Sequence, residues 1–183
     1  MIETQSMASG ATGKGRIAAI DAARAIALAA MAVYHFTWDL EFFGYVEAGT
    51  AASGGWKLFA RCIAGSFLAL AGMGLVLGHS QTVRWRSYLK RLARVAAAAA
   101  AITLVTWFAM PDTFIFFGIL HQIALAGILG LAFLRLPWFA TALAAAAIIA
   151  LPLVFRDPAF AAPWLRWTGL APFPPNSNDY VPV

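Results

Sequence analysis

Arg24 and His35 are two ionisable residues inside an otherwise apolar stretch of the sequence. They are eleven residues apart, which is about three helical turns plus 20°, so both side chains lie on one stripe of a helix. A charged group at membrane depth costs several kcal/mol, so an intramembrane pair of this kind indicates a functional site. Asp39 follows His35 by four residues, close enough for its carboxylate to fix the tautomer of the imidazole. Histidine titrates near neutrality, so this pattern indicates proton transfer.

His121 is a second candidate for the same chemistry. It lies in an apolar segment that we expect to span the membrane over residues 114–134, about two turns from the outer end. His35 is within about one turn of the outer end of its own span, so the two histidines could line one cavity. The alternative for His121 is an interhelical hydrogen bond that joins two spans.

The composition places the chain in a membrane. Apolar residues make up 62% of it and charged residues only 11%, which no ordinary soluble domain shows. We therefore predict an all-α, polytopic membrane helix bundle with membrane lipid as a partner. The net charge of +5 is no argument for nucleic acid, because the basic residues cluster between spans. With one cysteine and three histidines, and no metal-binding motif, we expect no metal site.

Five apolar segments follow a tail of 15 residues. The tail is rich in Ser, Thr, Gly and Ala, and we expect it to be a disordered cytoplasmic segment rather than a signal peptide. The remaining residues, 16–183, form one transmembrane domain, and small-residue faces in it would permit a homodimer. The predicted spans cover residues 17–38, 56–78, 92–110, 114–134 and 138–155.

A basic stretch between the second and third spans sets the expected orientation. Residues 79–94 contain five Lys or Arg residues and no acid, whereas the loop after the first span is acidic. This bias places the basic loop and the N-terminus in the cytoplasm. These basic residues either set the topology and contact lipid headgroups, or form a basic collar that binds the phosphates of a nucleotide-like donor. The residues that would form such a collar are Arg84, Arg86 and Lys90.

Four sequence blocks resemble one family of membrane acyltransferases. The first joins the segment around Arg24 to His35 and to Trp38-Asp39, and the others are residues 67–74, 116–121 and 178–182. In this order they resemble the bacterial relatives of the heparan-α-glucosaminide N-acetyltransferase catalytic domain. Members of that family usually continue into further spans after the last block, so we expect this chain to be the N-terminal part of a larger bundle.

The resemblance implies an enzyme of the bacterial inner membrane. It would transfer an acetyl or other acyl group from cytoplasmic acetyl-CoA or another acyl-CoA to an amine or hydroxyl of a glycan or glycolipid at the outer face. His35 would act as general base or as covalent acyl carrier, and Asp39 would orient it. Arg24 would bind the phosphates or the carbonyl group of the donor.

Two other classes of function remain open from the sequence alone. A small transporter or proton-coupled carrier would use Arg24, His35 and His121 to line a path, although no helix interruption or matching halves support it. A non-catalytic, truncated membrane protein that packs against a partner is the other alternative.

Overall fold

The computed structural model describes residues 17–181, and in this part of the chain all regular elements are helical. They are α1 (Ala18–Phe42), α2 (Gly54–His79), α3 (Trp85–Ala109), α4 (Ile119–Phe133) and α5 (Trp138–Val154), followed by the short 3₁₀ helices η1 (Pro158–Ala161) and η2 (Arg166–Thr168). The prediction of an all-α membrane helix bundle is confirmed. The predicted tail, residues 1–15, lies outside the described residues.

The helices differ in their capacity to cross a bilayer. α1, α2 and α3 have 25 or 26 residues each and are long and apolar enough to span the membrane. α4 and α5 are apolar but have only 15 and 17 residues. At 1.5 Å per residue they reach about 22–26 Å, less than the roughly 30 Å of a hydrocarbon core.

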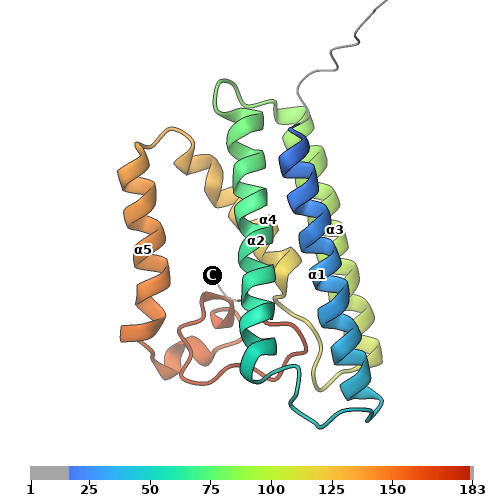
Figure 1. Cartoon of the computed structure of the whole chain (residues 1–183). Helices are drawn as coiled ribbons and strands as arrows, with labels where there is room; N and C mark the ends of the chain where they lie inside the picture. Colours follow the sequence, from blue (N-terminus) through green and yellow to red (C-terminus); the bar gives the residue numbers. More distant parts are fainter. Residues whose placement is uncertain (1–16, 182–183) are drawn as a thin grey trace, which may run out of the picture.

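α2 is the central helix of the bundle. It packs against both α1 and α4, and α3 packs against α4 (Figure 1). α5 stands apart from the other helices and has no buried residue. We name the end with the start of α1 and the link from α2 to α3 the basic end. The opposite end, where α1 stops and residues 155–181 fold under the bundle, is the acidic end (Figure 1).

The first helix extends further than its apolar stretch predicts. α1 continues to Phe42 instead of ending at residue 38, so Asp39 and Glu41 lie on the helix rather than in a loop. The carboxylate of Glu41 accepts hydrogen bonds from the backbone N–H groups of Gly49 (2.6 Å) and Ala51 (2.8 Å). Glu41 thereby fastens the connecting loop to the end of α1 and satisfies backbone donors that would otherwise be unpaired.

The fourth helix is shorter than predicted, because residues 114–118 are not helical. Their backbone groups have other partners. The Thr103 hydroxyl donates to the Ile115 carbonyl (2.7 Å), and the Ile115 N–H donates to the Thr106 hydroxyl (3.0 Å). Irregular backbone of this kind is tolerated at membrane depth only where protein covers it.

The C-terminal segment supplies that cover. The Val181 N–H donates to the Phe117 carbonyl (3.1 Å), and the Ser177 hydroxyl donates to the Phe114 carbonyl (3.0 Å). We expected an interfacial segment after α5. The structure folds it back onto the beginning of α4, so residues about 60 positions apart share one small folded unit.

Candidate functional site

The structure places the predicted site residues at two ends of the bundle. Arg24 lies in the second turn of α1, at the basic end, where Arg84, Arg86 and Lys90 also lie. His35 and Asp39 lie in the second half of α1, and His121 lies in the first turn of α4. The rise along α1 separates Arg24 from His35 by about 16 Å. A ligand that touches both groups must therefore be elongated.

His35 has an exposed side chain in the second half of α1. Its ring meets that of Tyr34 edge-to-face at 5.9 Å, and the Tyr34 hydroxyl donates to the Ala51 carbonyl (3.4 Å). Between His35 and Asp39, both of which the structure describes, there is no hydrogen bond. The four-residue spacing alone does not bring the carboxylate onto the ring.

Asp179 is the carboxyl group that the fold brings toward the histidines. Burial raises the pKa of Asp179 above its ordinary value, while the Ile119 N–H and the charges of His35 and His121 act in the opposite direction. The carboxylate accepts a hydrogen bond from the Ile119 N–H (3.0 Å) and so caps α4 from a position 60 residues away. An acidic group in the field of two histidines is a feature of proton-transfer sites.

Gly118 creates the space for this carboxylate. A Cβ atom added at Gly118 would overlap Oδ2 of Asp179 and would lie 2.8 Å from its Cγ, closer than van der Waals contact allows. The absence of a side chain is therefore what lets the carboxyl group approach the first turn of α4.

His121 uses both ring nitrogens in hydrogen bonds. Nδ1 accepts from the Gly118 N–H (3.3 Å), and Nε2 lies 3.1 Å from the Thr103 hydroxyl oxygen. That hydroxyl donates its only proton to Ile115, so Nε2 carries the proton and donates to Thr103. This neutral tautomer joins α4 to α3, which favours the structural alternative for His121 over a role as base.

The bond between His121 and Thr103 can be tested through stability. Thr103→Val removes the hydroxyl and leaves the Nε2–H and the Ile115 carbonyl without their partner. We expect a loss of about 1–3 kcal/mol in the free energy of unfolding, because partly buried groups become unsatisfied. Thermal unfolding in detergent measures this, with Val105→Ala at an exposed position of α3 as the control. An unchanged midpoint for Thr103→Val contradicts the assignment.

Basic side chains at the other end form two groups. Arg84, Arg86 and Lys90 line an open groove of about 480 Å³ at the start of α3, together with Trp85 and Ser87. Arg24 belongs to the second group. Its Nη1 atom donates to Oδ1 of Asp21 at 3.2 Å, as the three-residue spacing predicts.

Arg91 is a member of this second group that sequence reasoning did not single out. Its guanidinium reaches Gly74 on α2, where Arg24 arrives from α1. Arg91 is one of the five Lys or Arg residues between positions 79 and 94, and nothing in the sequence distinguishes it from the other four. The sequence also did not identify Asp179 as a site residue, although it lies in one of the four sequence blocks described above.

One comparison with known proteins yields a match. Residues 16–183 match the family model described as heparan-alpha-glucosaminide N-acetyltransferase, catalytic. The match covers the whole domain expected from the sequence and confirms the resemblance drawn from its four blocks. No curated protein and no solved structure matches the chain significantly.

Proposed function

The chain belongs to the heparan-α-glucosaminide N-acetyltransferase catalytic family of membrane acetyltransferases, and we propose that it transfers an acetyl group from acetyl-CoA to a sugar amine or hydroxyl. The observation that carries this proposal is the separation of a basic end from a histidine and carboxyl cluster within one bundle. A donor with phosphates at one end and a thioester at the other matches that separation.

The donor would enter at the basic end. Arg24 offers a fork of N–H donors for a phosphate, and the groove lined by Arg84, Arg86 and Lys90 adds positive charge beside it. From there the distance to His35 along α1 is about 16 Å, comparable to the extended pantetheine arm of coenzyme A. The thioester would then arrive beside the imidazole.

His35 would act as the general base. The acceptor amine or hydroxyl attacks the thioester carbonyl carbon while His35 takes its proton, and the carbon–sulfur bond breaks. The coenzyme leaves as a thiolate and takes up the proton from the imidazolium, which restores neutral His35. A positioned base of this kind contributes about 10²–10⁴-fold to the rate.

Asp179 would stabilise the imidazolium in place of Asp39. The partly buried carboxyl already lies in the field of His35, whereas Asp39 is exposed. Exposed charges interact weakly because solvent screens them. We therefore assign Asp39 to the surface of the acidic end, where it would meet acceptor or lipid rather than the base.

The charge distribution supports a cytoplasmic basic end. Five Lys or Arg residues lie within residues 79–94, and membrane proteins retain such stretches in the cytoplasm. In a bacterial inner membrane the donor would then come from the cytoplasm, and the glycan or glycolipid acceptor would bind at the opposite face.

Donor binding provides the first test. In purified protein held in detergent, acetyl-CoA binding should weaken at least about tenfold in Arg24→Ala, because a charged hydrogen bond to phosphate contributes roughly 1.5–3 kcal/mol. Arg156→Ala removes an exposed arginine at the acidic end and serves as the control. If native chain and Arg24→Ala bind equally well, Arg24 has no role in donor binding; if neither binds, the donor assignment fails.

The pH dependence of transfer tests Asp179. Because burial raises its pKa, the Asp179 carboxylate forms at a higher pH than an ordinary aspartate does, and activity should increase as pH rises through that pKa. Asp179→Asn has no such titration and should lose one protonation step from the acidic limb of the kcat/KM profile. An unchanged limb in the variant contradicts the assignment.

A further inference from the structure

Two guanidinium groups converge on one glycine near the basic end. A Cβ atom placed on Gly74 would lie 3.2 Å from Nη2 of Arg24, and 3.1 Å and 3.7 Å from Nη1 and Nη2 of Arg91. Both groups thus lie within about 3 Å of the same point, so their nitrogen atoms are no more than about 6 Å apart. Three helices contribute one residue each: α1, α2 and α3.

This convergence lies about two helical turns from the basic end of the bundle. Arg24 and Arg91 are each six residues from the start of their helix, and Gly74 is five residues from the end of α2, which places all three about 8–9 Å along their helices. Both arginine side chains are exposed on the bundle, and two like charges this close repel each other. Asp21 is the acid that the structure pairs with Arg24, and among residues 17–181 no salt bridge is formed by Arg91.

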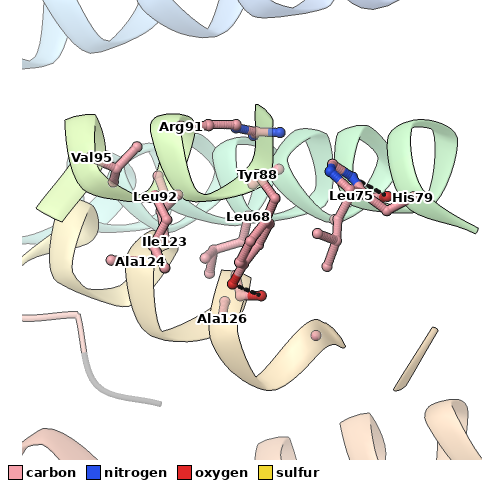
Figure 2. A pocket seen from close by; sticks show the side chains of 14 residues that line it. Leu68, Leu75, His79, Tyr88, Arg91, Leu92, Val95, Ile123, Ala124 and Ala126 are labelled. Atoms are coloured by element: carbon pink, nitrogen blue, oxygen red, sulfur yellow. Dashed lines mark hydrogen bonds between the residues drawn. The ribbon is translucent and has the colours of Figure 1, made fainter. Parts of the chain in front are cut away.

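An apolar cavity adjoins Arg91. It has a volume of about 110 Å³ and lies between α2, α3 and α4. Leu68, Leu75, Leu92, Val95 and Ile123 are among the residues that line it, and Arg91 runs along its edge (Figure 2). Arg91 therefore takes part in both features: its side chain lines the cavity, and its guanidinium lies beside Gly74, as that of Arg24 does.

His79 adds an unsatisfied polar group to this cavity. The residue is 9% exposed, and its Nδ1 atom lies 3.2 Å from the Leu75 carbonyl oxygen (Figure 2). Its Nε2 atom is buried and has no hydrogen-bond partner among the described residues. Buried polar atoms without partners are rare and costly, so a ligand that offers a hydrogen bond would be favoured here.

We propose that Arg24 and Arg91 together bind a phosphate group above Gly74, and that an apolar part of the same ligand occupies the cavity beside Arg91. A phosphate placed between the two guanidiniums accepts hydrogen bonds from both and removes their repulsion. This inference rests on the proposed function where the phosphate is that of the acyl donor. A phospholipid headgroup has the same chemistry, and the experiment separates the two sources.

Gly74→Ala is the most selective variant. It keeps both positive charges but occupies the point at which they meet, so both guanidiniums must move by a few tenths of an ångström. Gly65→Ala, on the same helix, meets no atom within 4 Å and is the matched control. Arg91→Ala removes one cation, and Arg94→Ala, an exposed position three residues further along α3, is its control.

Two probes identify the source of the phosphate. Coenzyme A binding is measured by calorimetry on the full chain in detergent, and retention of phosphatidylglycerol is measured by native mass spectrometry. If the site binds the donor, Arg91→Ala weakens coenzyme A binding about 10- to 100-fold, Gly74→Ala weakens it by a smaller factor, and the controls match the native chain. If it binds lipid, the same two variants lose the retained phosphatidylglycerol and bind coenzyme A normally.

Unchanged binding of both probes by both variants overturns the proposal. That outcome leaves the proposed acetyl transfer intact, because transfer is judged from His35 and from acetyl-CoA turnover rather than from Arg91. Conversely, if the native chain transfers no acetyl group but Gly74→Ala still loses phosphatidylglycerol, the phosphate site stands without the enzymatic function.

Discussion

His35→Ala should abolish acetyl transfer while the protein inserts, folds and binds acetyl-CoA as before. Removing a general base lowers the rate about 10²–10⁴-fold, and the exposed position of His35 means that its loss leaves no buried cavity. Turnover with labelled acetyl-CoA and a sugar amine measures the loss. Donor binding should be retained, because Arg24 is about 16 Å away.

The neighbouring residue provides a control for His35→Ala. Phe36 is 63% exposed on the same helix, and Phe36→Ala should alter neither turnover nor donor binding. Full turnover by His35→Ala would remove histidine from the reaction and would direct attention to the carboxyl groups at the same end of the bundle. Equal losses in both variants would instead indicate a general effect on α1.

Gly118→Ala should also lower turnover strongly, but through a steric effect on the fold rather than through the loss of a base. The added methyl group would overlap the Asp179 carboxyl group and would also lie 3.0 Å from the Ile115 side chain. Asp179 must then withdraw, so α4 loses its cap and the imidazole of His35 loses its carboxylate neighbour. Overpacking and the lost cap together predict about 2–5 kcal/mol of destabilisation, and turnover should fall at least about tenfold.

A double variant separates the two effects of Gly118→Ala. With Asp179→Ala added, the overlap is relieved and much of the stability should return, but turnover should stay low because the carboxylate is absent. Unfolding midpoints and turnover of the single and double variants measure this. Recovery of turnover together with stability would show that Asp179 serves only the fold.

The helical framework was predictable because apolar runs reveal helices directly. α2 and α5 begin and end within two residues of the apolar segments that predicted them. The start of α4 was not predictable, because the hydroxyl groups of Thr103 and Thr106 on α3 form hydrogen bonds with the backbone of Ile115. Residue spacing within one helix contains no information on such partners.

The candidate site was predictable only in part, for a related reason. Helical periodicity places Arg24 and His35 on one stripe, and the family pattern identifies both. Helical periodicity does not show how one helix is rotated relative to another, and that rotation is what brings Arg91 close to Arg24 above Gly74. Nor does it place Asp179, which is 144 positions from His35 and lies beyond the last helix of the bundle.

The cap on α4 has a consequence for the time course of biosynthesis. Asp179 reaches the Ile119 N–H only after the ribosome has added 60 further residues, including all of α5. α1, which carries both Arg24 and His35, is translated first, so it enters the bilayer before the Asp179 carboxyl group exists. If Asp179 supports His35 as proposed, the site would therefore be complete only after one of the last described residues has been translated.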